Sequence, residues 1–265
     1  MSRLALGHGW RRQLEDRDYL RTAGLVFGVP RIMQDVPAFS ARKILTVRSQ
    51  LGFSCCTGEA GAYAGQSNAW IDTKGKQNPV FSSWWSYIAA QRASGMLGRD
   101  EGATISGLAK GCATEGFALE SECPLPKRYT SRVSSATAAG HRLLKFVKIR
   151  SFAEFEAWQK NGFGPVVGGI TWTRALADCW GRVSLSDTKG RGLGHAVCWW
   201  GWTESGEWDQ INSHGTEWGD QGWALWSRDA ITSEIERGDT EFIGFSDVEN
   251  FDSPRELVGD WGGNG

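Results

Sequence analysis

The sequence changes character near residue 141, and this change limits the folds that the chain can adopt. The first half predicts three helices, over 55–70, 81–94 and 104–116, with serines suited to cap the first two and a glycine suited to end the third. From about residue 143 the chain gives short apolar or alternating segments between glycine, asparagine and aspartate turns, which is typical of antiparallel strands. We therefore expect an α+β fold in which a helical lobe and a β-rich, barrel-like lobe meet at a cleft.

The expected strands can be placed segment by segment, and the chain shows no obvious linker between its halves. We expect one domain over 1–265, with an N-terminal arm and the helical lobe over about 1–140, the β-rich lobe over about 141–250 and a C-terminal tail over 251–265. A short helix is predicted in SFAEFEAWQKNG. Strands are predicted in LLKFVKI, PVVGGITW, GHAVCWWGW, EWDQINSHG, GWALWS and EFIGFSDV.

The composition argues against several kinds of partner. Lys and Arg together number 29 and Asp and Glu number 30, so the net charge is -1 and no basic surface for nucleic acid or an anionic membrane is expected. Glycine occurs 35 times and tryptophan 15 times, which indicates tight turns and close backbone approaches, with large rings filling irregular gaps. This composition is not typical of a helical bundle.

The sequence carries no feature of export or membrane insertion. Its beginning has no apolar stretch of the roughly 7–15 residues that a signal peptide requires, and no segment approaches the ~20 apolar residues of a membrane span. A cytoplasmic location is the default expectation, with the 6 cysteines as reduced thiols. The cysteines form no CxxC pair and histidine occurs only 4 times, so neither a metal ion nor another cofactor is predicted.

The run CCTGEAGAYAGQSNAW after Ser54 predicts a helix with a slim face. Each glycine in a helix costs roughly 1 kcal/mol relative to alanine, so we expect this helix to lie buried against a close neighbour. Cys56 falls at the predicted start, where the helix dipole and the N–H groups of the first turn favour a thiolate. Cys55 lies about 100° away around the helix, so only one of the two thiols can face a given cleft.

Gln50, Cys56 and the small residues that follow resemble the active-site segment of papain-like cysteine peptidases. In that family a glutamine six positions before the nucleophilic cysteine supplies an oxyanion donor, and this spacing selects Cys56 over Cys55. The family histidine and asparagine follow about 130–150 residues after the cysteine. His195 in GLGHAVCWWGW and Asn212 in QINSHGTEWGDQGW follow Cys56 by 139 and 156 residues and lie in matching local contexts.

Other segments extend the resemblance over most of residues 9 to 247. GWRRQLEDRDY resembles the opening of a bacterial and viral subgroup that lacks the long inhibitory prosegment of its lysosomal relatives. DEGATISGLAKGCATEGFALESECPLP resembles a helical stretch of the same subgroup. The resemblance implies a papain-like two-lobed fold and the hydrolysis of amide bonds in a peptide or protein substrate.

The resemblance also implies a role for each site residue. Cys56 is the expected nucleophile and His195 its imidazolium partner and later general acid. Asn212 would fix the imidazole tautomer, and Gln50 would hold the oxyanion together with the backbone N–H of Cys56. Two further residues are expected to contact substrate, Trp218 on the leaving-group side and Gly102 along the cleft.

The sequence departs from the family pattern close to these residues. Thr57 follows the nucleophile in place of an aromatic residue, Cys55 stands where a small residue without a thiol is usual, and Phe53 replaces a disulfide cysteine. His214 replaces the tryptophan that shields the histidine–asparagine hydrogen bond from water. We therefore expect that bond to be wetter and catalysis to be less efficient, with the fold unaffected.

Other interpretations remain open from the sequence. The chain could keep the papain fold as a structural or interaction protein, for instance in a virus particle, or could use the same triad to hydrolyse a cell wall or isopeptide bond. Cys55 is expected to pack as an inert residue, with a redox role towards Cys56 as the alternative. Cys112 and Cys123 could pair in an oxidising space. The loop DTKGRGLG loosely resembles a nucleotide-binding fingerprint, but it lacks the strand–turn–helix context.

Overall fold

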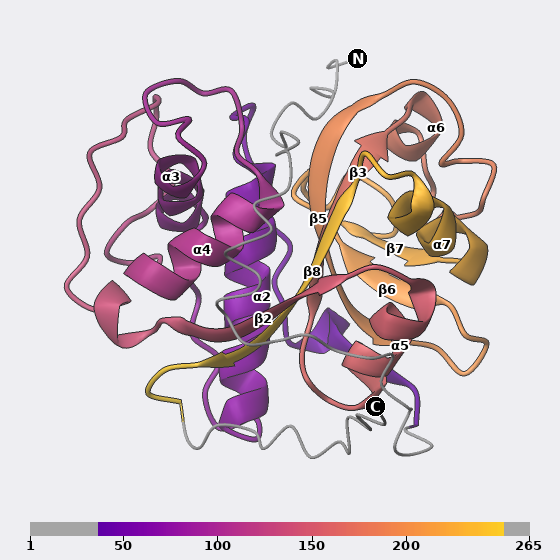
Figure 1. The fold of residues 1–265 in the computed structure, drawn as a ribbon, viewed down its shortest axis with the longest axis horizontal. Helices are drawn as coiled ribbons and strands as arrows, with labels where there is room; N and C mark the ends of the chain where they lie inside the picture. The colour runs from indigo at the N-terminus through magenta and orange to yellow at the C-terminus, as the bar shows by residue number, and fades with distance from the viewer. Residues whose placement is uncertain (1–36, 252–265) are drawn as a thin grey trace, which may run out of the picture.

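A computed structural model describes residues 37–251, in which the chain forms two lobes (Figure 1). The helical lobe contains α2 (Cys56–Asp72), α3 (Ser83–Ala93) and α4 (Ile105–Glu115). The β-rich lobe contains most of the sheet together with α5 (Phe152–Lys160), α6 (Arg174–Ala177) and α7 (Arg228–Glu236). This arrangement confirms the expected α+β fold. Two short 3₁₀ turns, η1 (Ala41–Lys43) and η2 (Ala138–Gly140), complete the helical elements of the described residues.

Local sequence sets the ends of the helices. The hydroxyls of Ser82 and Thr104 accept hydrogen bonds from backbone N–H groups in the first turns of α3 and α4. Gly116, with φ of 79°, ends α4 as predicted. The prediction for α2 is wrong by one residue, because its N-cap is Cys55 rather than Ser54 and makes no side-chain capping bond.

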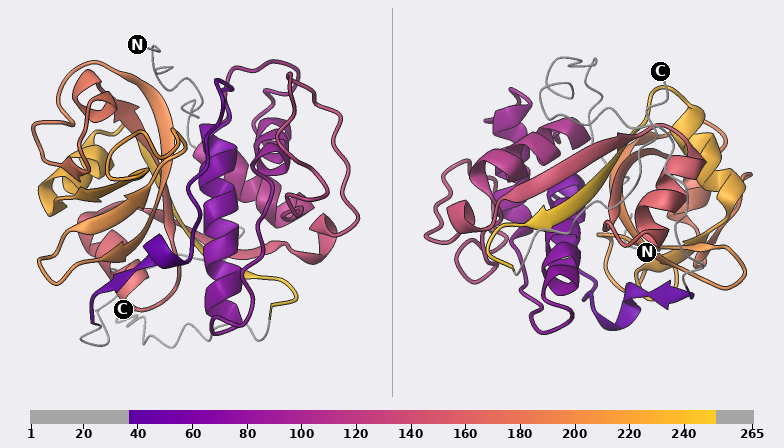
Figure 2. Two further views of the ribbon diagram at one scale, coloured as in Figure 1. Left: turned by 180° about the vertical axis from the view of Figure 1, so that it is seen from behind. Right: turned by 60° about the horizontal axis from the view of Figure 1, so that its bottom comes forward.

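The glycines of α2 allow three neighbours to approach it, as its slim face predicted. A Cβ added at Gly58 would lie 2.2 Å from a main-chain oxygen at the start of α3, and one at Gly61 would lie 2.6 Å from Leu108 of α4. A Cβ added at Gly65 would lie 2.9 Å from the ring of Phe117. Seen from behind, α2 stands between the other two helices and the sheet (Figure 2).

The described strands form one sheet in the order β2-β8-β3-β5-β6-β7-β4, with β1 paired to β5. Pairings among these strands are antiparallel except that of β4 with β7. β8 therefore lies between β2 and β3, and Figure 1 shows β2 and β8 running across towards the helices. The strands are β1 (Phe39–Ser40), β2 (Leu143–Ile149), β3 (Val166–Trp172), β4 (Arg182–Val183), β5 (Leu193–Trp202), β6 (Trp208–Ile211), β7 (Trp223–Trp226) and β8 (Glu241–Val248).

The long strand β5 is buried on both faces and separates two parts of the core. Trp199 and Trp200 are adjacent, so their side chains point to opposite faces of the strand. Trp200 belongs to a cluster that includes residues of all three helices, such as Leu108, whereas Trp199 packs with Phe155 and Trp226 in a second cluster. Because the first cluster contains residues of both lobes, it holds the helices against the sheet.

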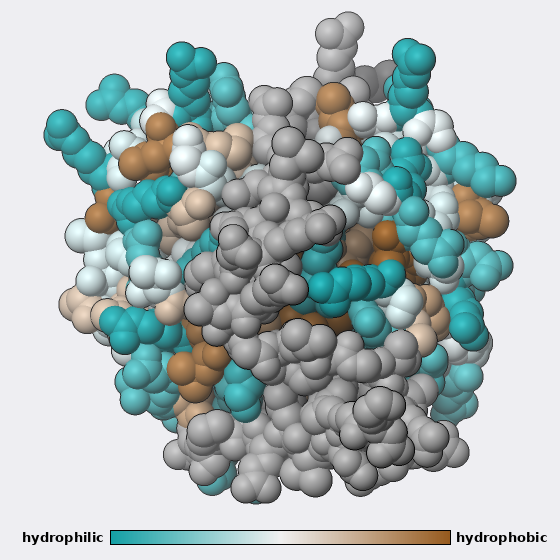
Figure 3. Space-filling view, in the orientation of Figure 1, coloured by the Kyte–Doolittle hydropathy of each residue, from teal (hydrophilic) through white to brown (hydrophobic). Residues whose placement is uncertain are grey.

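Some predicted segments fall outside the described residues, and some observed elements were not predicted. The GWRRQLEDRDY segment, the arm before residue 37 and the predicted tail beyond residue 251 lie outside them. The short elements β4, α6 and α7 have no counterpart in the sequence prediction. Within residues 37–251, no helix is both long and apolar enough to cross a bilayer. On the face drawn in Figure 3, polar side chains cover much of the described surface of both lobes.

Candidate active site

The site begins with the thiol at the start of α2. Cys56 is the first residue of that helix and is fully buried. The backbone N–H of Ala196 on β5 donates a hydrogen bond to Cys56 Sγ, with the two atoms 3.3 Å apart. A thiol from the helical lobe thus contacts the strand that carries His195. The positive end of the helix dipole at this position favours a thiolate over a thiol.

His195 and Asn212 form a hydrogen-bonded pair whose geometry defines where the proton lies. His195 Nε2 lies 2.7 Å from Asn212 Oδ1, and the backbone N–H of Ser213 donates to the same oxygen at 2.8 Å. Because this oxygen accepts from a main-chain N–H, the amide orientation is fixed and His195 Nε2 must carry a proton. His195 Nδ1 is buried and has no hydrogen-bond partner among the described residues. In the neutral ring, Nδ1 therefore keeps the lone pair that a general base needs.

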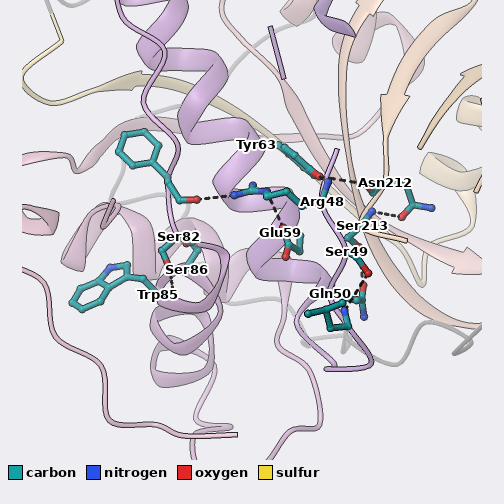
Figure 4. A network of polar contacts seen from close by, with 12 residues as sticks. Arg48, Ser49, Gln50, Glu59, Tyr63, Ser82, Trp85, Ser86, Asn212 and Ser213 are labelled. Atoms are coloured by element: carbon teal, nitrogen blue, oxygen red, sulfur yellow. Dashed lines mark hydrogen bonds and ion pairs between the residues drawn. The ribbon is translucent and has the colours of Figure 1, made fainter. Parts of the chain in front are cut away.

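Gln50 is tied to the residue after Asn212. Its backbone N–H donates to Ser213 O at 2.9 Å, and its side-chain Oε1 accepts from the Ser213 hydroxyl at 2.7 Å (Figure 4). Its Nε2 donates to Phe53 O at 2.5 Å. Of the two N–H bonds of this amide, one is used by Phe53 in the turn that leads into α2. The contacts fix the amide between the two lobes and identify Ser213 as a supporting residue, for which the Asn-Ser pair in the sequence was the signal.

A largely buried ion pair joins α2 to the segment that precedes it. Arg48 Nε lies 3.2 Å from Glu59 Oε2, and Arg48 Nη1 donates to Phe81 O at 2.8 Å. The backbone N–H of Arg48 donates to the Tyr63 hydroxyl, which in turn donates to Asn212 O at 3.4 Å (Figure 4). This chain of contacts connects α2 to the loop that carries Asn212. Because Asn212 lies 149 residues after Tyr63, spacing alone gave no sign of the network.

Burial governs the acid–base behaviour of the imidazoles. Desolvation lowers the pKa of His195 well below its ordinary value of 6.5, repulsion from His214 lowers it further, and the hydrogen bond to Asn212 raises it. Desolvation also lowers the pKa of His214, to about 4. An imidazolium at His195 therefore requires a nearby negative charge, which a thiolate at Cys56 would supply.

The prediction that His214 leaves the His195–Asn212 bond wet is wrong. His195 is 0 % exposed and Asn212 is 1 % exposed. The ring of His214 stacks on that of His195, with centroids 4.6 Å apart and 17° between the planes. Trp172 covers a further side of His195, with ring centroids 4.5 Å apart. A neutral imidazole presents a flat ring face, so it can cover the bond in place of an indole.

Trp172 is the site residue that the sequence reasoning missed, and it connects His195 to the predicted residue Trp218. The Trp172 and Trp218 rings are 5.6 Å apart, and the Trp218 indole N–H donates to Leu176 O at 2.9 Å. Trp172 on β3 pairs with Leu193 on β5. Leu193 lies two residues before His195, so both side chains point to the same face of β5. The β3–β5 register was therefore the missing signal. Trp218 is 2 % exposed, and its contact with substrate stays a prediction.

Gly102 lies in the helical lobe with a φ of 91°. Its N–H donates to the Tyr87 hydroxyl at 3.1 Å, and its carbonyl accepts from Gln91 Nε2 at 3.0 Å. Both main-chain groups therefore have partners inside the protein. The contact of Gly102 with substrate stays a prediction.

The adjacent cysteines have different chemical surroundings. Burial raises the pKa of the Cys55 thiol well above its ordinary value, and the neighbouring charge of Glu59 raises it further. Such a thiol stays protonated and is a poor nucleophile. All six cysteines are thiols in the structure, including the proposed pair of Cys112 and Cys123. Within residues 37–251, no three His, Cys, Asp or Glu side chains gather closely enough to hold a metal ion.

No known family profile matches the sequence, and no curated protein matches it. Solved structures do match. Xylellain, a cysteine protease from Xylella fastidiosa, has a TM-score of 0.67 and 18 % identity, covering 94 % of this chain and 99 % of its own. For procathepsin B from Trypanosoma congolense the TM-score is 0.63 at 16 % identity, with 92 % of this chain and 87 % of the other covered. For bromelain from Ananas comosus it is 0.57 at 17 % identity, with 77 % and 94 % covered. The chain therefore has the two-lobed fold of the papain-like cysteine proteases.

Proposed function

We propose that the protein is a cysteine peptidase that hydrolyses amide bonds in a peptide or protein substrate. The observation that carries the proposal is the hydrogen bond from Ala196 N to Cys56 Sγ, because Ala196 directly follows His195, which is paired with Asn212. The Nδ1 of His195 has no hydrogen-bond partner within residues 37–251 and supplies a base. The start of α2 at Cys56 supplies a favourable field for the thiolate.

The proposed reaction proceeds through a thioester. The proton of the Cys56 thiol passes to His195 Nδ1, and the sulfur attacks the carbonyl carbon of the scissile amide while the carbonyl π electrons move to oxygen. As the tetrahedral intermediate collapses, the C–N bond breaks and the leaving nitrogen takes the proton from His195 Nδ1. Water then attacks the thioester, His195 accepts its proton, and the proton returns to the sulfur as the acid product leaves.

Asn212 and Gln50 act on this reaction without forming bonds to the substrate carbon. Asn212 Oδ1 holds the proton on His195 Nε2, so Nδ1 is the nitrogen that exchanges protons with the sulfur. Gln50 Nε2 has a second N–H beyond the one given to Phe53, and we assign it to the developing oxyanion together with the backbone N–H of Cys56. The bonds from Ser213 hold Gln50 in place for this task.

Alkylation with iodoacetamide followed by mass mapping tests the proposal. We expect Cys56 to react preferentially at about pH 6, because only an activated thiol is ionised well below the ordinary thiol pKa of about 8.5. Cys112 and Cys198 serve as internal controls, since burial raises the pKa of both thiols. The preference should disappear in His195→Ala.

Equal and slow alkylation of all six thiols would contradict the proposal and would favour the structural or interaction protein considered above. Turnover of casein against turnover of purified peptidoglycan then separates a peptidase from a cell-wall hydrolase that uses the same residues. A peptidase cleaves the casein, and Cys56→Ser abolishes that cleavage.

A further inference from the structure

One carboxamide holds two imidazole rings in this site. Asn212 Oδ1 lies 2.7 Å from His195 Nε2, and Asn212 Nδ2 lies 3.4 Å from His214 Nδ1. The two rings lie face to face, with their centroids 4.6 Å apart. His195 comes from β5, whereas Asn212 and His214 follow β6. The same amide thus connects His195 to a residue on the adjacent loop.

The protons on this arrangement can be assigned from the chemistry of the amide. Asn212 Nδ2 can only donate, so His214 Nδ1 must accept and the proton of the neutral His214 ring must lie on Nε2. That Nε2 is buried and has no hydrogen-bond partner among the described residues. The alternative tautomer, with its proton on Nδ1, would set two N–H groups against each other and push the amide out of its present orientation.

We propose that His214 is a positioning residue, whose Nδ1 holds the Asn212 carboxamide in the orientation that presents Oδ1 to His195 Nε2. The inference rests on the peptidase activity proposed above. It gives a reason for a histidine, rather than only an apolar ring, next to the His195–Asn212 bond. His214 covers that bond with its ring face and accepts from the far end of the same amide.

Two titratable groups among the described residues lie close to this arrangement. The groups placed around the stacked rings are Asn212, Trp172 from β3 and the main chain of Ser49, which pairs with His214. Cys56 lies next to His195 through Ala196, and the Tyr63 hydroxyl donates to Asn212 O. Burial raises the pKa of Tyr63, so Cys56 is the group that can carry a charge here. A thiolate at Cys56 favours the imidazolium at His195, and a well-oriented Oδ1 favours it further. Repulsion from His214 also lowers the pKa of His195, but it acts only where His214 is charged, and His214 has a pKa of about 4. At the alkaline limb His214 is neutral, so loss of its acceptor should lower the pKa of the His195 imidazolium.

Two substitutions separate the acceptor from the ring. His214→Phe keeps a stacked ring and removes Nδ1, whereas His214→Asn removes the ring and keeps an oxygen acceptor close to the position of Nδ1. We expect kcat in His214→Phe to fall roughly tenfold with little change in KM, because the misplaced amide weakens only the alignment of His195. The alkaline limb of the pH profile of kcat should move down by about 0.7 pH unit. In His214→Asn both quantities should recover most of the way to native values.

Either of two results would overturn the proposal. One is an unchanged alkaline limb in His214→Phe, and the other is a loss of kcat in His214→Asn as large as that in His214→Phe. Both would mean that the ring matters and the acceptor does not. A second measurement needs neither a variant nor turnover. In the native protein, nitrogen NMR of the histidine rings should show His214 protonated on Nε2 and bare on Nδ1 at about pH 7. A proton on Nδ1 would overturn the proposal even in an active peptidase. The expected tautomer in a protein that cleaves no peptide would support the arrangement while refuting the proposed function.

Discussion

The oxygen and the nitrogen of the Gln50 side-chain amide make different contacts. Its Oε1 accepts from the Ser213 hydroxyl, and its Nε2 donates to Phe53 O. The oxygen side is therefore used to hold the residue, and the nitrogen side retains one N–H, which we propose to serve the developing negative charge. This division allows the proposed contribution of Gln50 to catalysis to be measured apart from its contribution to the structure.

Replacing Gln50 with alanine should lower kcat by roughly 10²–10³ with a small effect on KM, since an oxyanion donor acts mainly in the transition state. Steady-state kinetics with a peptide substrate checks this expectation. Ser213→Ala is the matched control, because it removes the bond to Oε1 and leaves the amide in place. Equal losses of kcat in the two variants would assign Gln50 a supporting role only.

The two buried imidazoles should make stability depend on pH. His214 has a pKa of about 4 in the folded protein and an ordinary value of 6.5, so the unfolded chain binds a proton more readily. Its contribution is fully present above about pH 6.5 and is lost as the pH falls towards 4. The free energy of unfolding should drop by about 2 kcal/mol on this account between about pH 7 and pH 4.5.

Urea unfolding of the native protein and of His214→Phe at the two pH values measures this contribution as a difference. The difference is needed because burial raises the pKa of Glu234 to about 7, and that carboxyl acts in the opposite direction, losing stability as the pH rises. The same pH dependence in both proteins would show that His214 titrates normally.

The spacing of Gln50, Cys56, His195 and Asn212 carried the sequence prediction of the reacting residues, and their catalytic roles stay a prediction. The structure does place His195 against Asn212 and Cys56 against Ala196. The sequence did not predict the surroundings of His195. The stacking of His214 and the approach of Trp172 depend on how β3 and β5 align, and a one-residue change in register would turn Trp172 to the other face. Polarity alone therefore led to the wrong expectation of a wet hydrogen bond.

Among the elements, α2 depends most on the absence of side chains. Gly58 faces the start of α3, Gly61 faces Leu108, and Gly65 faces Phe117. The neighbour at Gly58 is a main-chain oxygen, which cannot rotate away as a side chain can. The close approach of α2 and α3 fixes the helix that begins at Cys56.

Gly58→Ala should therefore destabilise the protein by about 2–3 kcal/mol, despite the better helix propensity of alanine, because overpacking a buried contact outweighs that gain. Chemical denaturation followed by tryptophan fluorescence measures the change. Gly140→Ala is the control, since its Cβ would meet only the end of the Asn250 side chain, at 3.1 Å. We expect the control to stay within about 0.5 kcal/mol of native, and a Gly58→Ala variant of equal stability would contradict the tight packing.

Capped helices and apolar strands were predictable, and the short elements were not. Ser82, Thr104 and Gly116 mark helix ends by chemistry that acts within one turn. α7 has few apolar residues, and one of its contacts with β3 is polar, from Thr171 N to Glu234 at 2.9 Å. Its apolar stripe of Ala230, Ile231 and Ile235 is too short to stand out in the sequence, and so short a helix is stabilised mainly by tertiary contacts.

One hydrophobic core cluster contains residues of both lobes and holds them together. Cys112 on α4 and Cys198 on β5 belong to the same cluster, and both are 0 % exposed. Strands β2 and β8 run from the β-rich lobe towards the helices (Figure 1). We infer that neither lobe keeps its packing when the other unfolds.

Unfolding should therefore be a single transition, and the two thiols report it from the two lobes. Pulsed alkylation across a urea series should expose Cys112 and Cys198 with the same midpoint. Tryptophan fluorescence should give that midpoint as well. Separate midpoints for the two cysteines would mean that the lobes unfold independently.

The position of β8 has a consequence for folding during synthesis on the ribosome. This strand is the last of those described, yet it pairs with both β2 and β3 and fills the place between them. A nascent chain on the ribosome thus carries the sulfur, the imidazole and the amide before residues 241–248 emerge to complete the sheet that aligns them. We therefore expect the order of translation to delay the alignment of these three groups until β8 has been made.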